Sequence, residues 1–398
     1  MSQSYMYNTQ NISAKNNFSN TINDTLIKNN EKFKKLPETL IKYFKNKTLK
    51  YNLDKRIFYY NHIVNRLKNI NTKQCLKEYS INSSKKDDVK GYSISDIVFL
   101  TKKFGSISKY GYIYIASIKN EIGKYPIASK IMINNSVNMF EANTNLKITD
   151  QIIKNMISRH FILTYKVILC DKVSSKNLPD IIISKKYYVL LNELARGDLK
   201  QLCNNKTFLK NDNILYNVFA QIILSISTFH HLGFIHGDCH WGNFLYHINH
   251  DVDSKSYHHY NIYGVNYYLK SCEYTMYIYD FGFAKKIKSG DISAIEADYV
   301  RIINAFRNKK IEPKSWISVD YNLPSDNVGN FAKSFKKLVY ENGINTKNNM
   351  LFLENLTNII IPFLLKAPNN IFVNKLPAGA KIINKKPYYI NKKIFIKD

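Results

Sequence analysis

The chain has 398 residues, which is enough to bury a sizeable core and suggests two or three structural units rather than one. Its 58 Lys and Arg residues outnumber its 30 Asp and Glu residues and give a formal net charge of +28. Lys, Asn, Ile and Tyr are overused together, as in proteins encoded by A/T-rich genes, so we expect mainly a solvated basic surface, and charge alone does not identify a nucleic-acid-binding protein.

The first part of the chain is predicted to be a disordered tail followed by a small helical extension. Residues 1–30 are rich in Asn, Ser and Thr, and they contain too few large apolar side chains to offset the entropy cost of ordering. Within residues 31–91, apolar side chains recur at steps of three and four residues, which places them on one helical face. These side chains are Leu53, Ile57, Tyr60, Val64 and Leu67. We therefore expect residues 31–91 to form a helical extension.

Residues 92–195 are predicted to form a small β-rich unit. Side chains alternate in character over residues 112–117, which is typical of a strand. Runs rich in β-branched and aromatic side chains follow at 126–133 and at 181–192. The first two of these strands suit a hairpin that opens the unit.

Residues 196–365 are predicted to be mainly helical. One long buried helix is marked by apolar side chains at helical spacing, which are Ile214, Val218, Ile222, Ile226 and Phe229. Residues 248–277, rich in His, Tyr and Asn, are expected to loop out as an inserted polar segment. Residues 366–398 are expected to form a basic C-terminal tail.

A segment with the residue types needed for phosphoryl transfer follows that helix directly. It reads His236-Gly237-Asp238-Cys239-His240-Trp241-Gly242-Asn243. Phosphoryl transfer needs a carboxylate that orients and deprotonates the acceptor hydroxyl, and a nearby amide oxygen that holds a metal ion on the phosphates. Asp238 and Asn243, five residues apart, can supply both. The alternative interpretation is a helix-terminating turn with a capping Asp and an incidental Asn.

A second segment, Tyr277-Ile278-Tyr279-Asp280-Phe281-Gly282, is an apolar strand that ends in an acidic residue before a flexible glycine. Together the two segments resemble the catalytic loop and the metal-binding turn of the protein-kinase-like superfamily. This form of the loop is also found in kinase-like enzymes that act on choline and aminoglycosides. Among protein kinases, the chain resembles divergent Ser/Thr kinases of large DNA viruses.

The resemblance implies a bilobal α+β fold, with a β-rich N-lobe at 92–195 and a helical C-lobe at 196–365. It implies ATP and Mg²⁺ as cofactors. Asp238 would be the catalytic carboxylate, with His236 and His240 as further catalytic residues of the loop. Asn243 would act in catalysis and, with Asp280, as a metal ligand.

The resemblance extends upstream to residues that would bind the nucleotide. Lys130, at the end of Ile127-Ala128-Ser129-Lys130, would neutralise the α and β phosphates, with Ala128 in the same cofactor-binding strand. A segment before it matches the Gly-rich phosphate loop with two of three glycines replaced by serine. Its cofactor-binding residues are Ser106, Ser108, Gly111 and Ile113.

Four further positions follow from the order of the motifs. Glu141 would pair with Lys130 and hold it at the phosphates, with Asp150 as the alternative partner. Backbone groups of Glu193 and Ala195 would hydrogen-bond adenine at the hinge between the lobes. Asp198 would contact the ribose or cap the next helix.

The resemblance implies transfer of the γ-phosphoryl group of ATP to a hydroxyl, with Ser or Thr of a protein substrate as the favoured acceptor. His240, where protein kinases of this class usually place Lys, and the lack of a clear Ala-Pro-Glu sequence favour a small-molecule kinase instead. The serine-substituted phosphate loop favours a pseudokinase that binds nucleotide without turnover. The net charge leaves open a basic nucleic-acid-binding scaffold, although no specific reading motif is recognisable.

The cysteines and the apolar runs bear on location. The five cysteines, Cys75, Cys170, Cys203, Cys239 and Cys272, form no Cys-x-x-Cys pair, so neither a zinc knuckle nor a disulfide framework is predicted. The longest apolar runs fall far short of the ~20 residues that span a bilayer, and the polar N-terminus lacks a signal peptide's apolar stretch. We therefore expect a soluble protein of a reducing, intracellular compartment: the cytoplasm, or the host cytoplasm or the virion if the protein is viral.

Overall fold

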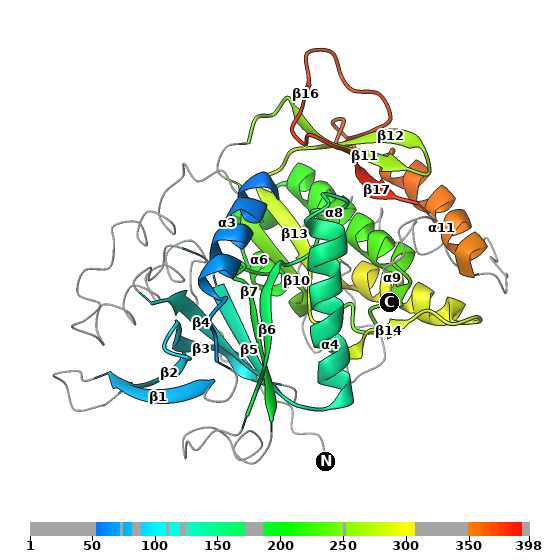
Figure 1. The fold of residues 1–398 in the computed structure, drawn as a ribbon. Coiled ribbons are helices and arrows are strands. Elements are labelled where there is room, and N and C mark those ends of the chain that lie inside the picture. The colour runs from blue at the N-terminus through cyan, green and yellow to red at the C-terminus, as the bar shows by residue number, and fades with distance from the viewer. Residues whose placement is uncertain are drawn as a thin grey trace.

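The chain has a mixed α+β fold in its computed structural model (Figure 1). The expected tail at 1–30 and the extension up to residue 52 lie outside the residues that the structure describes. The described residues are 53–71, 75–81, 89–108, 111–119, 125, 127–171, 186–249, 252–306 and 349–391.

The elements fall into two halves along the chain. The first half contains α3 (Leu53–Arg66), β1 (Leu76–Ile81), β2 (Val89–Ile94), β3 (Val98–Ser108), β4 (Gly111–Ile118), β5 (Ile127–Ile133), α4 (Ser136–Lys147), the π-helical η2 (Ile148–Ile153), β6 (Thr164–Cys170) and β7 (Tyr187–Glu193). The second half contains β8 (Gly197–Asp198), α6 (Leu199–Cys203), α7 (Lys206–Leu209), α8 (Asp212–His231), β9 (Phe234–Ile235), η3 (Trp241–Asn243), β10 (Phe244–Ile248), β11 (Ser256–Ile262), β12 (Val265–Lys270), β13 (Tyr274–Ile278), η4 (Phe281–Phe283), β14 (Lys285–Lys286), α9 (Ile292–Ala305), α11 (Asn349–Leu364), β15 (Phe372–Val373), β16 (Lys381–Ile382) and β17 (Tyr388–Ile390).

The first half folds into an antiparallel sheet of seven strands in the order β1-β2-β3-β4-β5-β7-β6. The strands expected at 112–117 and 126–133 are β4 and β5, and the described end of the run at 181–192 is β7. The prediction of a helical extension over 31–91 is wrong after α3, because β1 and β2 join this sheet. Leu76 of β1 pairs with Ile94 of β2, and both side chains are buried against the sheet.

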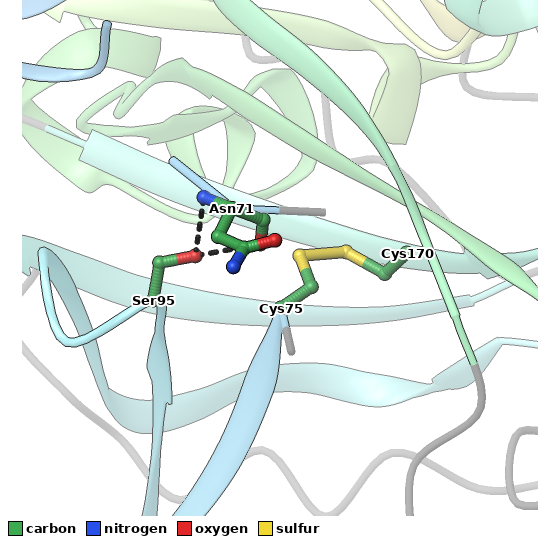
Figure 2. The surroundings of a disulfide bond; sticks show 4 residues. All are labelled: Asn71, Cys75, Ser95 and Cys170. Carbon is green, nitrogen blue, oxygen red and sulfur yellow. Dashed lines mark hydrogen bonds between the residues drawn. A yellow bond between two sulfur atoms is a disulfide. The ribbon is translucent and has the colours of Figure 1, made fainter. Parts of the chain in front are cut away.

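A disulfide between Cys75 and Cys170 ties the start of β1 to the end of β6, across 95 residues of sequence (Figure 2). Beside it, Asn71 N–H donates to Ser95 Oγ at 3.0 Å, and this hydroxyl donates to Asn71 O at 2.8 Å. The prediction of no disulfide is therefore wrong for this pair. Sequence spacing could not reveal it, because the fold brings the two cysteines together from opposite edges of a sheet. It also removes the argument for a reducing compartment that the cysteine pattern gave.

The second half is built around α8, whose side chains are buried on almost every side from Leu215 to His231. This is the long buried helix that the apolar spacing predicts. It packs against β13, α9 and α11, and β13 belongs to a small antiparallel sheet of order β13-β10-β8. No helix within the described residues is long and apolar enough to cross a bilayer.

The segments expected as a polar loop and a basic tail are part of the fold. Within the expected loop at 248–277, β11 and β12 form a hairpin, and three strands of the expected tail, β15, β16 and β17, pair with it. Figure 1 shows this five-stranded sheet beside α11, at the opposite end of the molecule from β1 and β2. Tyr260, Phe372 and Tyr388 are almost fully buried between these strands, so aromatic side chains outweigh the polar composition that suggested a loop.

Candidate active site

Lys130 of β5 lies between two carboxylates. Its Nζ is 2.6 Å from Glu141 Oε1 of α4 and 3.0 Å from Asp280 Oδ1 in the turn after β13. The side chains of Lys130 and Glu141 are 4% and 0% exposed, whereas that of Asp280 is 41% exposed. The expected ion pair between Lys130 and Glu141 is thus formed. Asp150, the alternative partner, instead pairs with Lys154 on the surface.

Burial and charge act against each other in this cluster. Burial alone would lower the pKa of Lys130, but Asp280 and Glu141 outweigh it and raise that pKa, so the ammonium stays charged. Burial raises the pKa of Glu141 to about 7, against the opposing effect of Lys130. Burial also acts to raise the pKa of Asp280, but the Lys130 ammonium holds it below its usual value. The result is a fixed cation beside a partly exposed anion, which can bind a phosphate and a divalent cation side by side.

The two carboxylate oxygens of Asp238 differ: one is hydrogen-bonded and the other is buried without a partner among the described residues. Asn243 Nδ2 donates to Asp238 O at 2.9 Å and to Asp238 Oδ2 at 3.1 Å, and His240 Nε2 lies 3.5 Å from the same Oδ2. Asp238 Oδ1 is buried and has no hydrogen-bond partner among the described residues. Burial raises the pKa of Asp238, with His240 and His236 acting in the opposite direction. A buried carboxylate oxygen of this kind can accept a proton from a hydroxyl placed next to it.

His236 joins the loop to the strand that carries Asp280. Its Nε2 lies 2.9 Å from Tyr279 O and donates to it, and its Nδ1 accepts from Asp238 N–H at 3.3 Å. Tyr279 N–H in turn donates to Asn243 O at 3.0 Å. The ring of His236 is therefore committed to holding the loop in place. His240, whose pKa burial lowers, lies beside the carboxylate of Asp238 and is 38% exposed.

Asp298 of α9 fixes the backbone of the loop, and the sequence motifs did not point to it. Its carboxylate is fully buried and accepts from His236 N–H at 2.8 Å, from Gly237 N–H at 3.0 Å and from His230 Nε2 at 3.0 Å. Arg301, one turn further along α9, donates to Gly237 O. The sequence signal that could have identified Asp298 is a charged residue within an otherwise apolar helical pattern. Asp298 shares the buried face of α9 with Ile295.

Gly237 has a conformation that no other residue adopts easily. Its φ is +75°, and a Cβ at this position would lie 2.8 Å from Phe283 O. The loop can therefore pass close to the turn after Asp280 only because this residue is glycine.

The turn at Asp280 is strained and packed from behind. Asp280 has φ +63°, which is uncommon for a residue with a side chain and is found most often at functional sites. Phe281 stacks on Phe229 of α8, with ring centroids 5.0 Å apart, and its ring edge meets His236 at 5.8 Å. This packing holds the turn and the catalytic loop against one buried helix.

The oxygen donors suit a magnesium ion. Asn243 donates to Asp238 through its Nδ2, so its Oδ1 lies on the other side of the amide, and the carboxylate of Asp280 is partly exposed. Phe244 pairs with Ile278, which sets Asn243 and Asp280 at the same end of β10 and β13. Amide and carboxylate oxygens are the ligands that Mg²⁺ prefers.

The strands that would carry the nucleotide lie side by side. Ile113 of β4 pairs with Lys130, and Ala128 pairs with Asn192 of β7, so these side chains share one face of the sheet. Ser106 and Ser108 lie in β3, and Ser108 pairs with Gly111. Residues 109 and 110 lie outside the described part of the chain. Gly111 also has a packing role, since a Cβ there would be 2.6 Å from Ile131 O.

The two residues expected at the hinge lie at the end of β7. Glu193 is the last residue of this strand, and its buried side chain forms an ion pair with Arg56. Ala195 is half-buried in the connection to β8. Asp198 caps α6 by accepting from Gln201 N–H at 2.7 Å. Of the two roles expected for Asp198, this is the helix cap.

No family model matches the chain, and no curated protein matches it.

Proposed function

We propose that this chain is an ATP-dependent phosphotransferase that transfers a γ-phosphoryl group to a hydroxyl, most favourably of Ser or Thr in a protein. The observation that carries the proposal is the buried Oδ1 of Asp238, which has no partner among the described residues and lies in a loop hydrogen-bonded to the strand of Asp280. Phosphoryl transfer needs little covalent chemistry from a protein, so positioning and charge are sufficient.

Each residue of the site has a role that fits its contacts. Lys130, kept charged by two carboxylates, would bind the α and β phosphates, and Glu141 would hold it in place. Asn243 and Asp280 would hold magnesium, which when bound neutralises charge on the phosphates. Asp238 would orient the acceptor hydroxyl and take its proton at Oδ1. Asp298 would keep the backbone of the loop in this conformation.

We further infer that the fold is a variant of the bilobal kinase architecture. In this assignment the seven-stranded sheet with α4 is the nucleotide lobe, and the part built around α8 is the substrate lobe. Support comes from chain order, because Lys130, Glu141, Glu193, Asp238 and Asp280 follow one another as the resemblance implies. The five-stranded sheet that contains β11, β12 and the C-terminal strands would be an addition to that architecture in this chain.

A small-molecule kinase is the second candidate, and the short connection after Asp280 favours it. β14 pairs with β9, and α9 begins at Ile292, so only residues 284–291 separate η4 from α9. Within the described residues, so short a connection leaves little chain next to the site on which an extended peptide could bind. The acceptor test below therefore includes both classes.

The proposal is tested with purified protein, labelled ATP, Mg²⁺ and two acceptor panels, one of acidic and basic proteins and one of sugars and amino alcohols. Asp238→Asn should lower turnover by about 10²–10⁴-fold and leave nucleotide binding nearly intact. Asp280→Asn should abolish magnesium-dependent nucleotide binding. Asp253→Asn, which changes an exposed carboxylate in the β10–β11 connection, is the matched control and should leave turnover unchanged.

The outcomes separate the candidates. Labelled protein identifies a protein kinase, and a labelled sugar or amino alcohol identifies a small-molecule kinase. Nucleotide binding without any transfer identifies a pseudokinase. Near-normal turnover in Asp238→Asn would show that the catalytic carboxylate is elsewhere.

A further inference from the structure

Helix α3 carries a buried arginine that binds the end of β7. Arg56 is 1% exposed, and its Nε lies 2.9 and 3.1 Å from the two carboxylate oxygens of Glu193. Nη2 lies 2.7 Å from Glu193 Oε2. The same Oε2 accepts from Leu163 N–H at 3.2 Å, and Glu193 N–H donates to Leu163 O at 2.8 Å. The end of β7 is therefore fixed through its backbone and through its side chain.

The same guanidinium binds the segment that pairs with β13. Nη1 donates to Arg159 O at 2.9 Å, and Nη2 donates to Phe161 O at 2.5 Å. His160 O between them accepts from Ile278 N–H at 2.9 Å, and Phe161 forms a bridge with Ile278. Ile278 is two residues before Asp280 in the chain, so this side of the guanidinium is linked to the turn that carries the metal-binding carboxylate.

A third contact leads to the same strand. The centre of the guanidinium lies 4.4 Å from the ring centroid of Tyr277 in β13. Arginine, unlike lysine, can bind a carboxylate with two nitrogens, donate to carbonyls with the rest of its fork and stack on a ring at the same time. The surroundings of Arg56 use all of these properties at once.

We propose that Arg56 is a positioning residue for the nucleotide site, and that α3 is a clamp between its two halves. One half is the hinge at Glu193, where the sheet ends, and the other is β13, which leads to Asp280. Figure 1 shows α3 where the sheet meets the part built around α8. The inference rests on the proposed function, because it assigns the hinge backbone to adenine and Asp280 to magnesium.

The clamp predicts a specific change in kinetics. Arg56→Met removes the guanidinium from the buried Glu193 carboxylate. This carboxylate keeps Leu163 N–H at 3.2 Å and His247 Nε2 at 3.8 Å but loses its arginine, and this displaces the hinge backbone. Because the proposed hinge binds the nucleotide and not the acceptor, the KM for ATP should rise by about tenfold or more while kcat falls much less. Arg56→Lys keeps the charge but loses the fork, and it should rescue part of the loss. In the double variant Arg56→Met with Glu193→Gln, the two effects on KM should be strongly non-additive, since no unpaired charge remains.

A matched control separates positioning from loss of stability. Phe372→Leu removes part of a fully buried side chain in β15 and should lower the melting temperature without changing the KM for ATP. If Arg56→Met lowered the melting temperature and left the KM unchanged, as this control does, Arg56 would be structural only and the clamp would be refuted.

A second measurement decides the clamp even if the wild-type chain transfers no phosphate. Amide hydrogen exchange in Arg56→Met should accelerate in residues 187–195 and in residues 274–282, but not in β11 and β12. Faster exchange at both sites without any wild-type transfer would support the clamp and refute the proposed function. Unchanged exchange at either site would refute the clamp, whatever the activity.

Discussion

Lys130 contacts two carboxylates that differ in what they can do. Glu141 is fully buried and has one oxygen, Oε2, without a hydrogen-bond partner among the described residues. Asp280 is partly exposed, so it can exchange Lys130 for a metal ion at little cost in burial. The buried carboxylate therefore holds the lysine, and the exposed one is available for binding.

This difference predicts unequal effects of two conservative substitutions. Glu141→Gln removes the charge that holds Lys130, so kcat/KM should fall by about 10- to 100-fold. Asp150→Asn removes the partner of Lys154, an exposed i,i+4 pair worth only about 0.3–0.5 kcal/mol, and should change kcat/KM less than twofold. Both values come from steady-state kinetics with ATP varied. An effect of Asp150→Asn equal to that of Glu141→Gln would show that Lys130 is not held in this way during turnover.

At the scale of elements, regular apolar spacing predicted the buried faces of helices reliably. It did not predict the charged residues that lie on those faces. The pattern in α3 correctly placed Leu53, Tyr60 and Leu67 on the buried face. It omitted Arg56, which occupies the same face, because an arginine is ordinarily assigned to the surface. Asp298 was missed for the same reason. Both residues are buried because the partners that compensate their charges come from distant segments, and a local pattern does not contain that information.

The candidate site residues could be named from the sequence because phosphoryl transfer, the proposed reaction, would require residues of these types at close spacing. Asp238 and Asn243 lie in one loop, and Asp280 directly follows a strand. The partner of Lys130 was left open between Glu141 and Asp150, since both lie on the next helical segment. Only the packing of α4 against the turn at η4 distinguishes them.

The segment after Asp280 predicts an enzyme that is active without phosphorylation of that segment. Many switchable kinases carry an arginine at the position of Gly237, where it pairs with a phosphorylated residue. Here the positive φ of Gly237 and the closeness of Phe283 O exclude such a side chain. Lys285, a possible substitute, pairs with Asp291 at 2.9 Å.

The prediction is checked by replacing Ser289 and Ser293, the hydroxyl residues of the stretch from Lys285 to Ala297, with Ala. Turnover should stay within twofold of wild type, before and after treatment with phosphatase. A large loss in either condition would contradict constitutive activity. It would then favour a lysine of this segment as the phosphate-binding group.

At the scale of the whole molecule, composition misled where aromatic residues were mixed with polar ones. Residues 248–277 were expected as a loop because they are rich in His, Tyr and Asn, and residues 366–398 were expected as a tail because they are basic. β11 is buried along most of its length, β12 is mostly exposed or half-buried, and β15, β16 and β17 have only two or three residues each, so local alternation does not mark these segments as strands. Their pairing joins segments about a hundred residues apart, as in Tyr260 with Tyr388, and such contacts are not readable from local sequence.

The C-terminal strands should therefore be essential to stability although their sequence is basic. Ending the chain at Leu365 removes Ile371, Phe372, Tyr388 and Ile390, each almost fully buried, and exposes the apolar side of β11 and β12. Losing one such side chain typically costs about 2–5 kcal/mol, so losing four together is comparable with the whole free energy of unfolding of a domain, about 5–15 kcal/mol. We expect the truncated chain to lose cooperative unfolding, measured by thermal and urea denaturation.

Phe372→Ala is the milder variant and should lower the free energy of unfolding by about 3–5 kcal/mol. The control keeps the backbone and removes charge: Lys375→Ala, Lys381→Ala and Lys386→Ala change exposed side chains and should each stay within about 0.5 kcal/mol of wild type. If the truncated chain unfolded cooperatively at the wild-type temperature, residues 366–391 would be the dispensable tail that their composition suggested.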